Sequence, residues 1–296
     1  MNKINRYIES LSSLEGKKVV ITGANSGLGF AIAKICLSKG ADVVLACRNE
    51  ARANKAKEEL LKAFPLGKVN VILYSQDSFS SCHQFVEELF NSHKDFYALV
   101  LNAGLFNAKR GVLNNEGFPI VSGTNTFGLA CILKDLDEKL KEVEDEKRII
   151  IQGSLAARLS KYKGIEKSLL NAKANHFTQY NNTKNASHNL FYHYAMNNYN
   201  PNVKYLLAEP GIAYSNIIRN YPKWFRWFAK LAMRLLFQSA EEGALPSNYL
   251  ISEKVANGDY YIPKAFLAIR GLPKKYFIKE KYIHPSQIEE INARIK

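Results

Sequence analysis

Short apolar runs alternate with longer amphipathic segments along most of the chain. The runs are rich in β-branched and large apolar residues, which is typical of buried strands. They cover residues 18–22, 42–47, 70–74, 96–102, 148–153, 203–209 and 259–262. Strands that are apolar on both faces and separated by helices form parallel sheets with helices on both faces. The pattern therefore predicts an α/β fold with a doubly wound, seven-stranded, mainly parallel sheet.

The rest of the chain gives no sign of a second domain. No internal repeat, low-complexity tract or Pro/Gly-rich linker divides the 296 residues, so we expect residues 1–296 to form a single domain. Ahead of the first predicted strand, Ile4, Ile8, Leu11 and Leu14 have helical spacing. This spacing predicts an N-terminal helical extension within residues 1–15.

Residues 220–237 form a basic and aromatic segment. Four basic residues are predicted on one side of a helix and five large apolar residues on another, which makes the helix amphipathic. The two sets are Lys223, Arg226, Lys230 and Arg234, and Trp224, Trp227, Phe228, Leu231 and Leu235. We interpret residues 215–240 as a lid over a substrate pocket. Two alternatives stay open, namely contact with a membrane surface and a face that packs in a homo-oligomer.

The net charge of +14 and the pI of about 9.4 bear on partners, since basic proteins attract phosphates, anionic lipids and nucleic acids. The lysines are spread over the whole chain, which is typical of solvated surface, so the sequence does not favour a nucleic-acid partner. No apolar run approaches the length needed to span a bilayer.

The cysteines and histidines indicate compartment and metal content. The four cysteines lack paired spacing, and the start of the sequence does not combine a basic stretch with an apolar run. Both observations favour a cytoplasmic protein with reduced thiols. The six histidines do not repeat at ligand spacing, and His188 and His193 read as ordinary helix residues. We therefore predict no metal site.

The first predicted strand runs directly into the turn "TGANSGLGF". Glycines at this place let the backbone approach a pyrophosphate, and the amides and dipole of the following helix favour its negative charge. A turn in this context predicts a Rossmann-type dinucleotide site. Its expected contacts are Gly23, Asn25, Ser26, Gly27, Leu28 and Gly29.

The end of the second predicted strand indicates which dinucleotide binds. An NAD site usually carries an acidic residue there to hold the ribose hydroxyls. This chain has Cys47, followed by Arg48 and Asn49. A guanidinium grips a 2′-phosphate with charge-assisted hydrogen bonds, so the sequence favours NADP (NADPH). The alternative is that Arg48 faces solvent without a ligand.

Two Tyr-x-x-x-Lys matches occur, at Tyr180 and Lys184 and at Tyr260 and Lys264. Pro263 excludes a regular helix at the second match. A helix at the first places both side chains on one face, where an ammonium lowers the pKa of the tyrosine. Such a tyrosine exchanges a proton with a carbonyl or alcohol, as hydride transfer requires. Ser154 follows the predicted strand 148–153 and is a further donor at the carboxyl edge of the sheet.

Several motifs in chain order resemble the short-chain dehydrogenase/reductase family. They are "TGANSGLG", "LNAG" at 101–104, Asn125 in "NTFG", Ser154, "YNNTK" and "PGIAYS" at 210–215. The resemblance implies that Tyr180 is the acid/base and that Lys184 holds the nicotinamide ribose and lowers the tyrosine pKa. It also implies that Ser154 orients the substrate oxygen and that Asn125 supports a water-linked proton relay.

The same resemblance assigns the remaining cofactor contacts. The segment with Asn102, Ala103 and Gly104 is expected against the adenosine half, and Pro210, Gly211, Ile212 and Ser215 are expected beside the nicotinamide. After the third predicted strand the chain reads "YSQD". Gln76 is our predicted contact there, although Ser75 and Asp77 remain alternatives for the adenine.

A narrower resemblance is to the branch of retinol dehydrogenases and protochlorophyllide reductases. It rests on "ACRN", on residues 114–128, and on the separation of 26 residues between Ser154 and Tyr180. Members of that branch act on large apolar carbonyl compounds, often with NADPH. This chain departs from the family pattern at Gly153, which replaces a serine, and at Leu101, which replaces an asparagine.

Three hypotheses follow from these patterns. The first is an NADP-dependent oxidoreductase that interconverts a carbonyl and an alcohol, or reduces an activated double bond. Its substrate would be a small molecule with a bulky apolar skeleton. The second is an NADPH-binding sensor with weak catalysis. The third is a protein that uses its positive charge to bind a membrane surface, through residues 220–237, or a nucleic acid.

Overall fold

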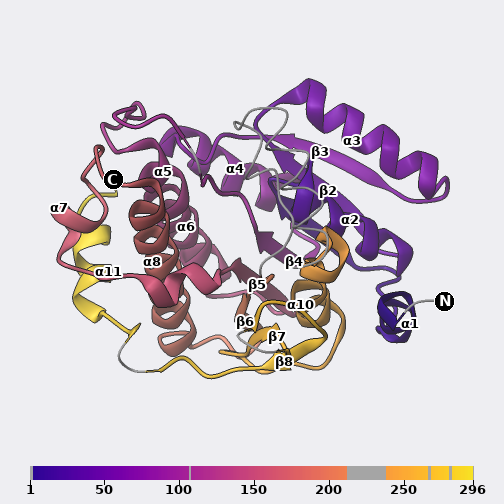
Figure 1. Cartoon of the computed structure of the whole chain (residues 1–296). Helices are drawn as coiled ribbons and strands as arrows, with labels where there is room; N and C mark the ends of the chain where they lie inside the picture. Colours follow the sequence, from indigo (N-terminus) through magenta and orange to yellow (C-terminus); the bar gives the residue numbers. More distant parts are fainter. Residues whose placement is uncertain (1–2, 107, 212–237, 266–267, 280–281, 296) are drawn as a thin grey trace, which may run out of the picture.

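The computed structural model describes residues 3–106, 108–211, 238–265, 268–279 and 282–295. Its sheet has eight strands in the order β3-β2-β1-β4-β5-β6-β7-β8 (Figure 1). The strands are β1 (Lys18–Thr22), β2 (Asp42–Cys47), β3 (Val69–Leu73), β4 (Phe96–Leu101), β5 (Lys147–Gln152), β6 (Val203–Ala208), β7 (Tyr260–Pro263) and β8 (Pro273–Lys275). Strands β1 to β7 pair in parallel. The predicted single, doubly wound α/β domain is confirmed.

The prediction of seven strands is wrong by one. Strand β8 pairs antiparallel with β7 at the edge of the sheet. It has three residues, begins with Pro273 and continues with two exposed lysines, Lys274 and Lys275. Proline and lysine are typical of edge strands, but they give no alternation of apolar and polar residues. The apolar pattern could not reveal this strand.

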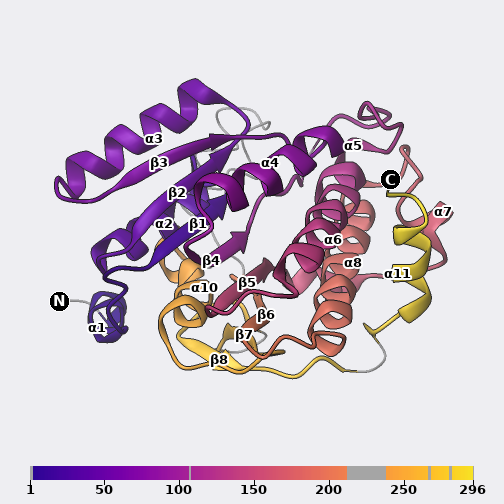
Figure 2. The ribbon, with the colours of Figure 1, turned by 180° about the vertical axis from the view of Figure 1, so that it is seen from behind.

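Helices cover both faces of the sheet (Figure 2). They are α1 (Lys3–Ser10), α2 (Gly27–Ser38), α3 (Glu50–Ala63), α4 (Phe79–Ser92), α5 (Ile120–Ser122), η1 (Gly123–Gly128), α6 (Leu129–Leu140), η2 (Leu155–Leu159), α7 (Ile165–Ser168), α8 (His176–Met196), α10 (Ala240–Ser252) and α11 (Pro285–Asn292). One apolar core includes side chains of α4, α6 and α8, and the other includes side chains of α2, α3 and α10. Each fully buried aliphatic or phenylalanine side chain contributes about 1.5–3 kcal/mol.

The N-terminal helix is shorter than the spacing of its apolar residues suggests. Helix α1 ends at Ser10, yet Leu11 and Leu14 are both buried. The chain turns back onto the body, and the amide of Leu14 donates a hydrogen bond to the carbonyl of Lys39 at 2.7 Å. Helical spacing therefore reflected burial over residues 11–14 rather than a continuous helix.

The carboxyl ends of β1, β4, β5 and β6 meet at one edge of the sheet. The chain order reverses between β1 and β4, and ligands of doubly wound sheets bind at this reversal. Of the residues 215–240 that we interpreted as a lid, 215–237 lie outside the described residues, and the predicted amphipathic helix at 220–237 lies wholly there. Among the helices that are described, none combines the length and the apolar character needed to cross a bilayer.

Candidate active site

A cavity of about 660 Å³ opens at the carboxyl edge of the sheet. It extends from the glycine turn between β1 and α2 to the residues that follow β5 and to one face of α8. Of the predicted site residues, those lining it are Gly23, Asn25, Ser26, Gly27, Leu28, Gly29, Arg48, Gln76, Asn102, Ala103, Gly104, Ser154, Tyr180, Lys184, Pro210 and Gly211. Ile212 and Ser215 lie outside the described residues. The fold thus brings both predicted ends of the site into one pocket.

At the nucleotide end, Asn102 ties the glycine turn to β4. Its amide nitrogen donates to the carbonyl of Thr22 at 2.8 Å, and its backbone N–H donates to the Thr22 hydroxyl at 2.9 Å. A Cβ atom on Gly29 would lie 2.6 Å from the Asn102 side chain and 2.7 Å from the carbonyl of Gly23. Only glycine fits there without displacing backbone, so the turn is held close to the strand.

The first turn of α2 has free amides for an anion. Its N-cap residue, Ser26, forms no side-chain hydrogen bond to the helix. The first amides of a helix lack partners within the helix and attract phosphate. The residues present therefore fit the pyrophosphate of a dinucleotide.

Arg48 lines the cavity beyond β2, and its side chain is 64% exposed. Its Nη1 lies 3.2 Å from a carboxylate oxygen of Asp77, which also accepts a hydrogen bond from Ser75. Asn49 has a different position. Its side chain accepts a hydrogen bond from the amide of Arg52 at 2.9 Å and caps α3. Asn49 is outside the described lining of the cavity.

Gln76 is buried and uses its side chain within the protein. It donates to the carbonyls of Thr124 at 2.8 Å and Ala103 at 3.4 Å, and it accepts from the Tyr74 hydroxyl at 2.8 Å. These bonds give Gln76 a role in holding the cavity wall. Ser75 and Asp77 also line the cavity, so the choice among the three for an adenine contact stays open.

Tyr180 and Lys184 lie one turn apart on α8, as predicted from their spacing. The Lys184 ammonium is 6.0 Å from the centroid of the Tyr180 ring and donates to the carbonyl of Gln152 at 2.9 Å. Burial lowers the pKa of Lys184 to about 8. The second match starts in β7, where Tyr260 belongs to a strand, so it does not form the same pair.

The pKa of Tyr180 differs from the expectation. Burial raises it, the hydrogen bond with Ser154 lowers it, and the charge of Glu209 raises it further. Desolvation of the phenolate is the largest of these effects, so the pKa of Tyr180 is raised overall; the predicted lowering by Lys184 stays a prediction.

Asn125 lies in the π-helix η1, a helix form that is frequent at functional sites. Its amide nitrogen donates to the carbonyl of Leu105 at 2.7 Å and to the Thr183 hydroxyl at 3.1 Å, and its oxygen accepts from the Leu105 amide at 2.7 Å. The side chain thus joins the loop after β4 to α8. Its predicted part in a proton relay stays a prediction.

An apolar wall beside Tyr180 escaped the sequence analysis. It consists of Phe106, Leu155, Leu159 and Phe177, all of which line the cavity. The Phe106 ring stands edge-on to Tyr180 and Phe177, with centroid distances of 4.8 and 5.3 Å. Leu159 and Phe177 are 68% and 63% exposed. These residues come from the loop after β4, from η2 and from the first turn of α8, so no periodic pattern could group them.

Two buried polar residues behind the site were also missed. His188, which we took for an ordinary helix residue, has its Nε2 3.4 Å from the backbone nitrogen of Ser154. The Glu209 carboxylate lies 3.5 Å from the Nε2 atom of His188. The sequence hints at this only through Gly153, where a larger side chain would collide with the His188 ring.

The prediction of no metal site stays a prediction. Within the described part of the chain, His83, Cys131 and Asp135 place ligand-type atoms within 4.8 Å of one another. However, His83 Nδ1 and Asp135 Oδ2 are 2.5 Å apart, whereas two atoms bound tetrahedrally to one zinc ion lie roughly 3.3 Å apart. His83 and Asp135 therefore bind each other here.

The comparisons with known proteins extend over most of the chain. A family model described as short chain dehydrogenase matches residues 17–225. Human retinol dehydrogenase 14 is 27% identical over 300 residues, which cover 95% of this chain and 84% of that protein. Chloroplastic protochlorophyllide reductase of Pisum sativum is 36% identical over 165 residues, covering 52% of this chain and 40% of that protein.

Other matches are partial or concern the fold alone. A WW domain-containing oxidoreductase of Gallus gallus is 31% identical over 150 residues, or 51% of this chain and 36% of that protein. The chain thus spans well under half the length of two of these relatives. The structure of L-sorbose reductase from Gluconobacter frateurii, complexed with NADPH and L-sorbose, matches with a TM-score of 0.65 and 20% identity over 84% of this chain and 95% of that chain.

Proposed function

Because the chain belongs to the short chain dehydrogenase family, we propose that it is an NADP-dependent oxidoreductase. The proposed reaction moves hydride between the nicotinamide and a carbonyl, alcohol or activated double bond of a bulky apolar substrate. The observation that carries the proposal is one cavity with a phosphate-binding turn at one end and Ser154, Tyr180 and Lys184 at the other. The matches to retinol dehydrogenase 14 and protochlorophyllide reductase support it.

In this proposal the chain's own residues handle the proton. NADPH, when bound, supplies the hydride. Tyr180 gives its hydroxyl proton to the substrate oxygen, and it takes the proton back in the opposite direction. Ser154, which lines the same cavity as Tyr180, orients that oxygen. Lys184 adds positive charge one helical turn away.

The preference for NADP rests on Arg48. Its guanidinium borders the cavity and its carboxylate partner Asp77 is at 3.2 Å. A 2′-phosphate with a charge near −2 competes with one partly buried carboxylate for the guanidinium. We therefore propose that Arg48 turns from Asp77 to the phosphate when NADPH binds.

The substrate class rests on the apolar wall. Phe106 stands edge-on to the ring of Tyr180, and Phe177 packs against Phe106. Both line the cavity and would contact the carbon skeleton of a substrate whose oxygen reaches Ser154. Apolar and aromatic lining with a few polar groups is typical of sites for large hydrophobic ligands. Cytoplasmic location, a homo-oligomer and membrane contact through 220–237 stay predictions.

The test is NADPH consumption by the purified protein with retinoid aldehydes, bulky aromatic ketones, quinones and small polar sugars. We expect turnover of the bulky apolar compounds. Tyr180→Phe should lower kcat by about 10²–10⁴-fold and leave the NADPH dissociation constant nearly unchanged. Full activity of this variant would disprove the assigned proton donor. Tight NADPH binding without turnover of any compound would favour the sensor hypothesis instead.

A further inference from the structure

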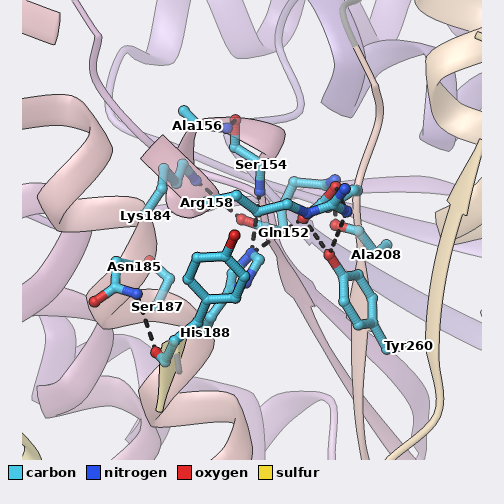
Figure 3. A network of polar contacts seen from close by, with 12 residues as sticks. Gln152, Ser154, Ala156, Arg158, Lys184, Asn185, Ser187, His188, Ala208 and Tyr260 are labelled. Carbon is cyan, nitrogen blue, oxygen red and sulfur yellow. Dashed lines mark hydrogen bonds and ion pairs between the residues drawn. The ribbon is translucent and has the colours of Figure 1, made fainter. Parts of the chain in front are cut away.

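Glu209 directly follows β6, and its side chain is completely buried. Arg158 Nη2 donates to its Oε2 at 2.8 Å, and the Tyr260 hydroxyl donates to its Oε1. Arg158 also donates to the Tyr260 hydroxyl at 3.1 Å (Figure 3). Burial is the largest effect on the pKa of Glu209 and raises it overall, while Arg158 and Tyr260 act in the opposite direction. A guanidinium at 2.8 Å and a hydroxyl donor favour the charged form of this carboxylate.

His188 lies between this anion and the reacting residues. Its Nε2 is 3.5 Å from Glu209 Oε1 and accepts a hydrogen bond from the backbone N–H of Ser154 at 3.4 Å (Figure 3). Gly153 makes this position possible, because a Cβ atom there would lie 2.6 Å from the same Nε2. The glycine that departs from the family pattern thus leaves space for the imidazole.

The arrangement is not a hydrolytic Ser-His-Glu triad. A triad histidine uses one nitrogen for the serine hydroxyl and the other for the carboxylate. Here both neighbours face Nε2, and the contact with Ser154 is through its backbone. The Ser154 hydroxyl instead accepts from the amide of Ala156 at 3.2 Å. Burial, Arg158 and Lys184 lower the pKa of His188 to about 3, so the ring is neutral at ordinary pH.

The anion and the catalytic lysine act on Tyr180 with opposite charge. Lys184 donates to the carbonyl of Gln152, and the Gln152 side chain donates to the carbonyl of Ala208 at 2.9 Å, next to Glu209. β5 and β6 therefore fix both charges in one rigid frame. The negative charge of Glu209 raises the pKa of Tyr180, which favours the neutral phenol.

We propose that His188 and Glu209 are positioning residues of the oxidoreductase site. His188 fixes the backbone of Ser154, and Glu209, 3.5 Å from His188 Nε2 and joined to η2 and β7 through Arg158 and Tyr260, places negative charge behind the reacting residues. This inference rests on the proposed function. Besides Lys184, the charged or titratable groups that face this network in the described residues are Arg158 from η2, Tyr260 from β7, and Tyr276, Lys279 and Tyr282 from the chain after β8.

The first test is Glu209→Gln, which keeps the shape and removes the charge. We expect Tyr180 to titrate about one pH unit lower. The measurement is NMR titration of ¹³Cζ-labelled tyrosine, with the Tyr180 signal assigned by its loss in Tyr180→Phe. The upper pH limit of carbonyl reduction should move down equally, since reduction needs the protonated phenol. Glu166→Gln is the control, because that carboxylate is exposed and its partner is Arg294; it should leave the titration unchanged.

A second variant guards against misfolding. Glu209→Gln alone leaves the guanidinium of Arg158 without its anion, which is destabilising for a buried partner. The double variant Glu209→Gln with Arg158→Gln removes both charges and should still show a lower Tyr180 titration than the wild type. A titration that stays at the wild-type value in whichever of the two variants folds would overturn the electrostatic role of Glu209.

The contact between His188 and Ser154 is tested by substitutions at Gly153 and at His188. Gly153→Ala should lower kcat about tenfold by displacing His188 and the backbone of Ser154, with little change in NADPH affinity. His188→Ala in the same chain should restore part of the loss, because the collision at 2.6 Å disappears. His188→Asn, which keeps an acceptor, should retain more activity than His188→Ala. Equal kcat in all of these variants would overturn the positioning role.

The two proposals fail in distinguishable ways. If the wild type turns over no substrate, the proposed oxidoreductase function fails, while the NMR titration still measures the effect of Glu209 on Tyr180. If the wild type is active but Glu209→Gln changes neither the titration nor the pH limit, the oxidoreductase function stands and the inference about Glu209 is rejected.

Discussion

The nucleotide end of the cavity is built mainly from backbone, and the reacting end from charged and polar side chains. In the turn after β1, the close approach of Gly29 to Gly23 and Asn102 determines the shape. At the reacting end, Lys184, His188 and Glu209 are buried, and in our proposal the charges behind Tyr180 affect its titration. The first region depends on the absence of side-chain volume, and the second depends on the presence of buried charge.

This difference predicts that the two ends respond to different changes. Added side-chain volume should weaken binding at the nucleotide end, whereas a change of pH or charge should alter the chemistry at the reacting end. A steric variant at the turn should raise the dissociation constant for NADPH without shifting a pH profile. An electrostatic variant behind Tyr180 should shift a pH profile without changing NADPH binding.

The largest effect is expected for Gly29→Ala. Its new methyl would lie 2.7 Å from the Gly23 carbonyl, so backbone must move. We expect a loss of about 1–3 kcal/mol in the free energy of unfolding and a weakening of NADPH binding by at least tenfold. Urea unfolding and fluorescence titration with NADPH measure the two effects. Lys34→Ala on the same helix is the control, since its ion pair with Glu241 is half exposed and contributes little. Wild-type NADPH affinity in Gly29→Ala would contradict the backbone account.

The second prediction concerns pH and the reacting end. The pKa of His188 is lowered from 6.5 to about 3, so the unfolded chain takes up a proton on this residue before the folded protein does. Its contribution to stability is therefore complete above pH 6.5 and is lost as the pH falls toward 3. The slope is about 1.4 kcal/mol per pH unit, which makes about 2 kcal/mol between pH 6.5 and 5.

Urea unfolding at several pH values tests this prediction. His188→Asn removes the titrating group and should flatten the slope in this range, although the variant is less stable at neutral pH. Other histidines remain in both proteins, so the difference between the two curves isolates His188. Parallel curves would show that His188 has the same pKa in the folded and the unfolded state, which would contradict the prediction.

The same contrast explains what could be read from the sequence. The strands were found because continuous apolar runs bury both faces, and the glycine turn was found because its function depends on local spacing. Tyr180 and Lys184 were found because they are one helical turn apart. In contrast, His188 and Glu209 come from different elements and meet only in three dimensions. The apolar wall is equally scattered, and β8 is an edge strand without an apolar pattern.

The third prediction concerns the nucleotide end and tests whether Arg48 determines the preference for NADPH over NADH. Arg48 is paired with Asp77 at 3.2 Å, and charge-assisted hydrogen bonds contribute about 1.5–3 kcal/mol. Arg48→Ala should weaken NADPH binding about tenfold or more and leave NADH binding nearly unchanged. Asp77→Asn should instead strengthen NADPH binding, because the competing carboxylate is gone. Calorimetric titration with both cofactors measures these changes. Equal losses for NADPH and NADH would remove Arg48 as the source of specificity.

The smallest effect is expected at Asn49, and it separates a cap from a cofactor contact. Asn49 accepts a hydrogen bond from the Arg52 amide at 2.9 Å and caps α3. Loss of such a cap costs about 1 kcal/mol of stability. Asn49→Ala should therefore lower the free energy of unfolding by that amount, and Asn49→Ser should recover most of it, with NADPH affinity unchanged in both variants. If Asn49→Ala instead weakened NADPH binding with no loss of stability, Asn49 would contact the cofactor together with the adjacent Arg48. Side chains would then contribute more to NADPH affinity than the backbone geometry of the glycine turn alone indicates.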